Sequence, residues 1–430
     1  MQIKKIKING FRNITETNIS FEAITALVGL NGYGKSNVIA AINFGLKFIH
    51  ASNSFKSTMM SSKKQIPLLK ANSGKDYQFG ITLMLESGGK SYYVDYNYSF
   101  SWGTNQSPAK IKSEILKIKQ NSPGKRYNTY IQRDEKSAQY KPSINGRCNK
   151  TITIEDNALI INKLLALDEL FFLDVIKQVN NIQFFIEHHL DPRSSFEPSP
   201  FVIKGIQELE LPSIQNIPHA IFLLKRDYPD KYELLINAFK QLFHNVLDIN
   251  VQEITLNQLT TKIKFSEDAP FMFTDNVYSM SIVDNRLIQP IGFEALSDGT
   301  KRIFLMLTYA IIADIKNLAM IAIEEPENSI HPSLFQNYLD VLTQLVNNCK
   351  IIITSHSPYV IQYLNPNYIY IGMTNSTGEA NFKKIASSKI NRLMKDASTY
   401  SNSLGDYIFT LISSDDANES LAEYIEGGND

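Results

Sequence analysis

One stretch decides the fold of this chain: Gly29-Leu30-Asn31-Gly32-Tyr33-Gly34-Lys35-Ser36-Asn37. Its first eight residues match the phosphate-loop pattern G-x-x-x-x-G-K-[ST] in full. Residues 24–28 before it read as a short buried strand, and the apolar residues of 37–49 after it predict a largely buried helix. This strand–turn–helix context distinguishes a phosphate site from an ordinary glycine turn before a helix.

The chemistry of such a loop follows from its backbone. Glycines allow successive N–H groups to point inward around an anion, and the helix N-terminus adds a partial positive charge. Lys35 is expected to reach the outer phosphates, and the Ser36 hydroxyl is expected to join a Mg2+ shell. The residues expected to bind the nucleotide here are Asn31, Gly32, Gly34, Lys35, Ser36 and Asn37.

Length and composition set broad limits. At 430 residues the chain predicts two domains or one domain with a large insertion. Its 43% hydrophobic and 20% charged residues are typical of a soluble globular protein. Cys148 and Cys349 are far apart and imply no disulfide framework. With no signal-peptide core and no apolar run near the ~20 residues that span a bilayer, we expect a cytoplasmic protein without a membrane partner.

Charge is balanced overall but unevenly distributed. Residues 51–150 hold 17 Lys and Arg against 6 Asp and Glu, whereas residues 401–430 hold 7 acidic and no basic residues. This pattern indicates a surface that faces a polyanion, such as a nucleic acid, and a separate contact segment. A solvated face is the alternative.

The order of expected elements indicates an α/β fold with a split nucleotide domain. Its first half is expected at 1–100 and its second half at 251–400, with an insertion at 101–250 and an acidic C-terminal tail at 401–430. The insertion reads as a basic β/loop part and then helices at about 159–189 and 231–247. The aromatic run 92–102 is interpreted as sheet core or interface rather than as a platform for stacking bases.

Two strands of the second half end in reactive side chains. Residues 317–323 lead into Glu324 and Glu325, and residues 350–354 lead into Ser355 and His356. Ligands of α/β sheets gather at the carboxyl ends of parallel strands. We therefore expect Glu324 in the Mg2+ shell, Glu325 as the base that orients the attacking water, and His356 beside the γ-phosphate. An acidic helix start and a structural histidine are the alternatives.

A second anion cradle is predicted at Leu296-Ser297-Asp298-Gly299-Thr300-Lys301-Arg302, before an apolar helix. One chain already has its phosphate loop. Ser297 and Gly299 therefore raise the question of whose phosphate they hold.

Taken in order, the phosphate loop, the Ser-x-Gly turn, the strand with two acids and the strand-end histidine resemble an ABC-type ATPase head. The resemblance is closest to the branch of SMC, RecF and OLD-like ATPases. The opening Ile8-Asn9-Gly10-Phe11-Arg12-Asn13 and the run Glu325-Pro326-Glu327-Asn328-Ser329-Ile330-His331-Pro332 also carry it. The match covers residues 1–50 and 290–362, and it implies a P-loop NTPase fold with mixed sheets plus a helical/β insertion.

The resemblance implies ATP and Mg2+ as cofactors and a head-to-tail homodimer or higher oligomer. Ser297 and Gly299 of one subunit would cap the ATP held by Lys35 of the other. Arg12 would approach the phosphates, and Gln78 is the candidate glutamine for a Mg2+ contact. Glu324 stands where most relatives have Asp, and Asp298 replaces a common glycine.

In function, the chain resembles the ATPases of Septu, PARIS, retron-associated and abortive-infection systems. These imply a sensor that controls a separate effector, often a nuclease or another toxin, with no nuclease activity expected in this chain. The alternative is a RecF-like repair ATPase that clamps DNA through the basic region 51–150. A transporter subunit is disfavoured by the long insertion.

Overall fold

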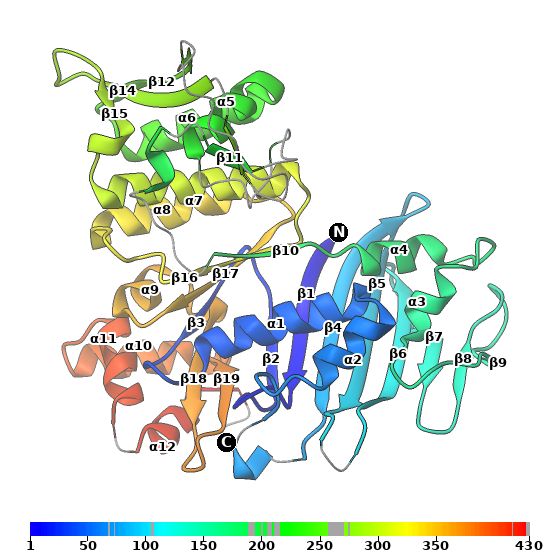
Figure 1. Ribbon diagram of the computed structural model, residues 1–430. Helices are drawn as coiled ribbons and strands as arrows, with labels where there is room; N and C mark the ends of the chain where they lie inside the picture. Colours follow the sequence, from blue (N-terminus) through cyan, green and yellow to red (C-terminus); the bar gives the residue numbers. More distant parts are fainter. Residues whose placement is uncertain are drawn as a thin grey trace. The chain divides into compact units, whose positions relative to one another are not determined.

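The structure is a computed structural model that describes residues 1–67, 69–72, 74–104, 107–187, 194–198, 201–203, 209, 216–256, 271–273, 276–414 and 416–426. The chain forms two compact units. The first unit contains Met1–Ile186, Ala319–Pro326 and Lys350–Asp430, and the second contains Glu187–Leu318 and Glu327–Cys349. Figure 1 shows the elements of each unit. No helix in the described chain is both long enough and apolar enough to cross a membrane.

A six-stranded sheet in the first unit has the order β10-β16-β17-β3-β18-β19. Its strands are β10 (Phe184–Glu187), β16 (Met320–Glu324), β17 (Lys350–Ser355), β3 (Ile24–Val28), β18 (Ile369–Thr374) and β19 (Ala380–Lys384). Strands β16, β17, β3 and β18 run parallel. Their near-continuous apolar runs suit strands that are buried on both faces.

The register of this sheet explains why its functional side chains meet. Glu324 of β16 pairs with Thr354 of β17, and Ser355 of β17 pairs with Val28 of β3. The phosphate loop follows Val28 directly. Since these strands are parallel and adjacent, their carboxyl ends deliver the loop, the acids and the strand-end histidine to one edge.

An eight-stranded antiparallel sheet in the same unit has the order β2-β1-β4-β5-β6-β7-β8-β9. Its strands are β2 (Thr17–Ser20), β1 (Gln2–Asn9), β4 (Tyr77–Ser87), β5 (Lys90–Ser101), β6 (Lys110–Gln120), β7 (Asn128–Arg133), β8 (Ala138–Tyr140) and β9 (Lys150–Thr151). Gly88 and Gly89 turn the chain between β4 and β5 with positive φ angles, as expected for a tight hairpin. Strand β6 pairs with β5, so the sheet continues from the N-terminal region into residues 110–151.

Helix α1 (Lys35–His50) covers one face of this sheet (Figure 1). Tyr77 and Tyr98 donate from their hydroxyls to the α1 carbonyls of Ala41 and Gly45, at 3.0 and 2.8 Å. The close approach requires a glycine, since a Cβ at Gly45 would lie 2.2 Å from the Phe79 ring. The side chains of Tyr96, Tyr98, Phe100 and Trp102 are buried, which confirms sheet core for the aromatic run.

Shorter helices complete the first unit: α2 (Asn53–Met60), α3 (Ile160–Leu164), α4 (Leu173–Asn180), α9 (Pro358–Tyr363), α10 (Ile390–Thr399), α11 (Leu404–Ile412) and α12 (Ala417–Ala422). The segment 401–430, expected as an acidic tail, folds in its described part as α11 and α12. Tyr407, Ile408, Leu421 and Tyr424 there are buried.

The second unit combines helices with a small sheet. It holds α5 (Ile217–Asp227), α6 (Pro229–Leu242), α7 (Asp298–Ile315), α8 (Pro332–Leu345) and the strands β12 (Val246–Thr255), β14 (Asn276–Asp284) and β15 (Ile291–Gly292), with β11 (Phe201–Ile203) paired to β13 (Phe271–Phe273). Helix α7 buries most of its length. An ion pair of 2.6 Å between Lys231 and Asp314 joins α6 to α7.

Helices were expected within residues 159–189, and this expectation is confirmed for 160–180 but wrong for 184–187. The structure has two short helices, α3 and α4, followed by strand β10 at Phe184–Glu187. Asn181 ends α4, and Phe184-Phe185-Ile186 favours a strand. The expected strands of 249–292 are present as β12 to β15 in their described parts, while residues 257–270 lie outside the described residues.

Candidate functional site

The phosphate loop has the backbone that its sequence predicts. Gly32 and Gly34 take φ angles of +85° and +87°, a region that favours glycine. Gly34 is the N-cap residue of α1, so the N–H groups at the start of the helix belong to the phosphate loop. Lys35 is buried, and its ammonium donates to the carbonyl oxygens of Gly29 at 2.6 Å and Leu30 at 3.1 Å.

A pocket of about 220 Å³ lies at this loop, entirely within the first unit. It is lined by Asn31, Gly32, Gly34, Lys35, Ser36, Asn37, Glu324, Glu325 and Thr354. Six loop residues that were expected to bind the nucleotide therefore line one pocket together with the two glutamates at the end of β16. The arrangement places a lysine and N–H donors opposite two carboxylates, as phosphoryl chemistry requires.

Glu325 and His356 form a direct contact. Nδ1 of His356 lies 3.0 Å from Oε1 of Glu325, and both side chains are partly exposed. Glu325 has a φ angle of +49°, in the left-handed region, and its N–H donates to the carbonyl of Thr354 at 2.9 Å. Strained backbone of this kind clusters at functional sites, and here it turns the carboxylate toward the histidine.

The residues present fit a Mg2+ ion that arrives with a nucleotide. Ser36, Thr354 and Glu324 offer hydroxyl and carboxylate oxygens, the ligands that Mg2+ prefers. Among the described residues, no group of three or more His, Cys, Asp or Glu side chains could hold a metal ion. A Mg2+ here would therefore depend on phosphate oxygens as well as on Ser36 and Glu324.

Arg12 reaches the start of α1 through side-chain contacts. It has a positive φ of 51°, and its Nη1 donates to Oδ1 of Asn37 at 2.8 Å. Nδ2 of Asn37 donates in turn to Oδ1 of Asn13 at 2.7 Å. Arg12 thus stands one side chain away from the phosphate loop.

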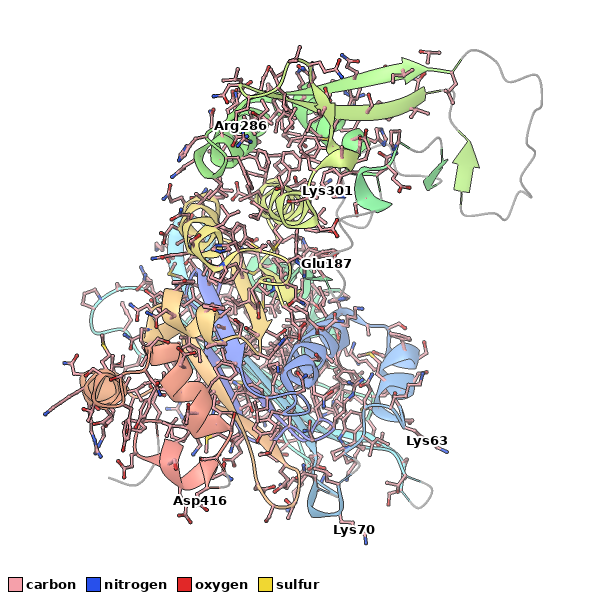
Figure 2. The ribbon with its side chains drawn as sticks, turned by 90° about the vertical axis from the view of Figure 1, so that its left-hand side faces the viewer. Lys63, Lys70, Glu187, Arg286, Lys301 and Asp416 are labelled. Carbon is pink, nitrogen blue, oxygen red and sulfur yellow. The ribbon has the colours of Figure 1, made fainter. Side chains whose placement is uncertain are left out.

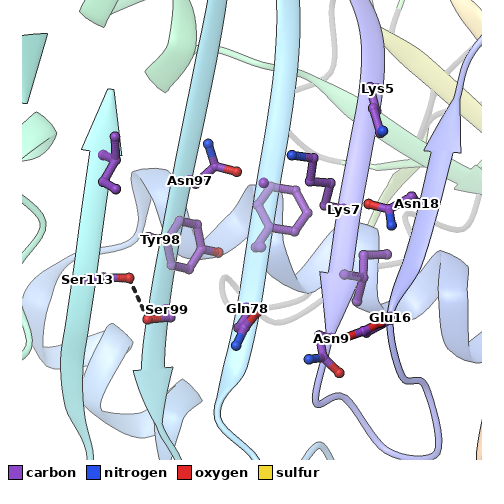
Figure 3. Close-up of a pocket in the computed structure, with 14 residues that line it drawn as sticks. Lys5, Lys7, Asn9, Glu16, Asn18, Gln78, Asn97, Tyr98, Ser99 and Ser113 are labelled. Atoms are coloured by element: carbon purple, nitrogen blue, oxygen red, sulfur yellow. Dashed lines mark hydrogen bonds between the residues drawn. The ribbon is translucent and has the colours of Figure 1, made fainter. Parts of the chain in front are cut away.

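Gln78, the expected glutamine of the Mg2+ shell, lies elsewhere in the same unit. It belongs to β4 and lines a groove on the face of the eight-stranded sheet opposite α1 (Figure 3). The neighbouring residues Tyr77 and Phe79 point toward α1, so alternation along the strand turns Gln78 away. The structure does not bring it to the phosphate loop.

Ser297 and Gly299 belong to the second unit. Ser297 caps α7: its Oγ accepts from the N–H of Thr300 at 3.2 Å. A Cβ at Gly299 would lie 2.3 Å from the carbonyl oxygen of Ser329, so this glycine permits a close backbone approach. Both residues therefore have a local structural role, and Ser297 remains exposed at the helix start.

Only some of the basic side chains in region 51–150 are exposed at the surface. Lys63 and Lys70 are exposed on the first unit (Figure 2). Lys56, Arg133 and Lys141 are instead buried. Lys56 donates to Asn162 and Arg133 to the carbonyl of Ala158. The excess of positive charge thus overstates what this region offers to a polyanion.

Two residues of the site were missed from sequence. Thr354 lines the pocket and Asn13 holds Asn37. Thr354 precedes the strand-end Ser355-His356, so its position at the edge of the sheet was a usable signal. Asn13 belongs to the opening run 8–13 that carries the family resemblance, and its position next to Arg12 was the signal available.

A phosphate loop after a central strand of a largely parallel sheet, with two acids and a histidine at the ends of nearby strands, defines a P-loop nucleotide-binding fold. A family model described as "AAA domain, putative AbiEii toxin, Type IV TA system" matches residues 24–362. The chain belongs to this family.

Similar sequences are named as DNA repair ATPases. A "DNA double-strand break repair Rad50 ATPase" of Sulfurisphaera tokodaii is 34% identical over 98 residues, which is 23% of this chain and 10% of that protein. A protein of the same name from Methanococcus maripaludis is 44% identical over 57 residues, 13% of this chain and 6% of its own. The matches thus span a tenth or less of these relatives.

Two of the solved structures to which the chain is similar are described as SMC heads. One, described as the SmcHead bound to the C-winged helix domain of ScpA, has 14% identity and a TM-score of 0.47, and the match covers 91% of this chain and 100% of that one. The SMC head domain from Thermotoga maritima has 13% identity and a TM-score of 0.43, with 90% and 100% covered.

Proposed function

We propose that this chain is a Mg2+-dependent ATPase that serves as the sensor or regulator of a prokaryotic anti-phage defence system and controls a separate effector. The observation that carries the ATPase part is the single pocket shared by Lys35, Ser36, Glu324 and Glu325. The family description, which names a toxin of a type IV TA system, supports the defence role. A cytoplasmic location is part of this proposal.

In the proposed reaction, backbone N–H groups of Gly32 and Gly34 and the ammonium of Lys35 hold the phosphates. Glu325 orients a water for in-line attack on the γ-phosphorus, and His356 holds the carboxylate in place through the 3.0 Å contact. Mg2+, held by Ser36 and Glu324, would neutralise charge on the phosphate oxygens. Product release would return Lys35 to the carbonyls of Gly29 and Leu30.

The ATP is proposed to be shared between two copies of the chain. Ser297 is exposed at the N-terminus of an 18-residue helix, α7, where N–H groups can cap an anion. Ser297 and Gly299 of one copy would complete the site of Lys35 in the other, so that ATP binding drives association. The effector, a nuclease or another toxin, would respond to that change, and we expect no nuclease activity in this chain.

Phage challenge together with purified protein tests this proposal. Glu325→Gln should abolish both ATP turnover and protection against phage, whereas the exposed control Glu22→Gln should preserve both. Protection that survives in Glu325→Gln cells would refute control by hydrolysis. A protein from a neighbouring gene that co-purifies with the wild type and acquires nuclease or toxin activity would identify the effector.

A RecF-like repair ATPase that clamps DNA is the second candidate. The relatives named as double-strand break repair ATPases and the exposed lysines of region 51–150, such as Lys63 and Lys70, favour it. ATP-dependent binding of duplex DNA that falls steeply with salt would support this candidate. Duplex binding that is independent of ATP would count against it.

A further inference from the structure

The eight-stranded sheet carries a polar groove on the face opposite α1. The groove has a volume of about 640 Å³ and crosses β2, β1, β4, β5 and β6. Six polar side chains that line it are Lys5, Lys7, Asn9, Asn18, Gln78 and Asn97. All of them belong to the first unit, and none takes part in the phosphate-loop pocket.

The floor of the groove is shaped by a glycine in the middle of a strand. Gly80 of β4 lies between Lys7 of β1 and Asn97 of β5 in the register. A Cβ there would lie 2.2 Å from Oδ1 of Asn97 and 3.4 Å from Cβ of Lys7. Figure 3 shows Lys7 and Asn97 pointing toward β4 from the strands on its two sides.

The glycine and the asparagines of the groove weaken a sheet. Glycine and asparagine are depleted in strands, and a glycine inside a strand often marks the close approach of a ligand. A merely solvated face would be served better by threonine, lysine or glutamate. The cluster of Gly80, Asn9, Asn18 and Asn97 therefore points to a use other than stability.

Six polar side chains of the groove make no polar contact of their own with the rest of the described chain. None of the six polar side chains makes a hydrogen bond or ion pair with any part of the chain that the structure describes. Two other polar pairs on this face are satisfied: Thr82 donates to Asp95 at 3.1 Å, and Ser99 and Ser113, which also line the groove, lie 2.6 Å apart. Oδ1 of Asn9 is buried and has no partner among these residues. Six polar side chains of the groove thus keep their hydrogen-bonding groups available for a ligand.

We propose that this groove is a second binding site for a nucleoside phosphate, separate from the phosphate-loop pocket. The ammonium groups of Lys5 and Lys7 match a phosphate. The amides of Asn9, Asn18, Gln78 and Asn97 each present a donor and an acceptor, which is what the edge of a base requires. The exposed carboxylate of Glu16 lies beside Asn9 (Figure 3), so the phosphate belongs at the Lys5 and Lys7 end and the base at the Asn9 and Gln78 end.

The size of the groove suits this ligand, because small-molecule sites fall between roughly 300 and 1,000 Å³. A nucleoside phosphate has two sources, a free nucleotide and a unit of a single-stranded nucleic acid. An acidic peptide offers negative charge but would not need the base edge that the four amides can read.

Binding experiments in a Lys35→Ala background, in which nucleotide binding at the phosphate loop is weakened, test the proposal. The probes are adenosine 5′-monophosphate in equilibrium dialysis and a labelled short oligodeoxyadenylate in fluorescence anisotropy. We expect at least one of them to bind. Lys7→Ala should weaken that binding about tenfold, and Gly80→Thr should abolish it by filling the groove. The exposed hairpin lysine in Lys90→Ala is the matched control and should change nothing.

Each outcome supports or overturns the proposed nucleoside phosphate site. Binding of the mononucleotide alone identifies a free nucleotide, and binding of the oligonucleotide alone identifies a strand. No binding of either probe, binding that survives in Gly80→Thr, or displacement of the probe by polyglutamate overturns the proposal. Threonine suits a strand, and Asn97 Oδ1 ends a flexible side chain, so Gly80→Thr should stay folded. Unchanged ATP turnover of Gly80→Thr with intact Lys35 separates this site from the proposed function.

Discussion

Lys35 is held inside its own loop by two carbonyl oxygens, those of Gly29 and Leu30. A triphosphate would exchange these neutral acceptors for charged ones, which bind an ammonium more strongly. The lysine side chain therefore already lies within the phosphate loop before a nucleotide binds.

Lys35→Ala should reduce the affinity for ATP and Mg2+ about tenfold to a hundredfold, because a charge-assisted hydrogen bond is lost. Isothermal titration calorimetry measures the change. Lys47→Ala is the matched control, since Lys47 is an exposed lysine of the same helix. Equal affinity in the Lys35 and Lys47 variants would contradict the assignment.

Glu325→Gln should keep the affinity for ATP and lower turnover by about 10²–10⁴, the usual contribution of a general base. The amide keeps the shape and the hydrogen-bond reach of the side chain but cannot take a proton. Binding and phosphate release are measured on the same preparation. A variant that turns over at the wild-type rate would exclude Glu325 as the base.

Single residues could be predicted from sequence where a fixed pattern ties them together. The phosphate loop and the two acids after β16 are such cases, and they share one pocket. The position of Gln78 could not be predicted, since the sequence does not say which residues of β4 point toward α1 and which point toward the opposite face of the sheet. Thr354 and Asn13 act through neighbours that only the folded chain brings near.

Among the elements of the first unit, a buried carboxylate links β6 to α3. Glu114 is fully buried and accepts from the N–H groups of Ile160 at 2.5 Å and Ile161 at 2.9 Å and from the Tyr96 hydroxyl at 3.0 Å. It thereby caps the start of a short helix that has no cap of its own. Glu114→Gln should lower the free energy of unfolding by about 1–3 kcal/mol. The glutamine amide has an NH2 donor in place of one carboxylate oxygen, so one backbone N–H group loses its acceptor. Urea unfolding measures the loss.

The effect of Glu114→Gln should depend on pH. Burial raises the pKa of Glu114 above its ordinary 4.5, although the two backbone N–H groups oppose the shift. The folded state therefore binds the proton more readily than the unfolded state. As pH falls from neutral toward 4.5, the wild type gains stability relative to the variant, and the gain is complete below that value. A stability difference that shrinks on acidification would contradict the assigned burial.

Long apolar strands and the strand–loop–helix unit could be predicted as elements, since their patterns are local. The same holds for the Gly88-Gly89 hairpin. The end of α4 and the strand β10 could not, because a short apolar run suits helix and strand equally and its pairing in the sheet decides. The helices α11 and α12 were not predicted, because the acidic residues of 401–430 indicated a tail. The buried apolar residues between those acids form the helices' packed faces.

At the scale of the whole molecule, the chain divides its machinery between two units. The phosphate loop, Glu324, Glu325 and His356 belong to the first unit, and Ser297 and Gly299 belong to the second. The split of the nucleotide domain into sequence-distant halves follows from strand order, since β3 lies beside β17 in the sheet. The sharing of one ATP between two copies remains the proposal on which the account of regulation depends.

Mixing two inactive variants tests that sharing most directly. Ser297→Arg and Lys35→Ala proteins should each lack ATPase activity. In a mixed pair, one site combines the intact Lys35 of one subunit with the intact Ser297 of the other. We expect activity to return on mixing, in proportion to the share of mixed pairs. A mixture that stays inactive while the two variants associate, or Ser297→Arg protein that hydrolyses ATP normally at high dilution, would contradict it.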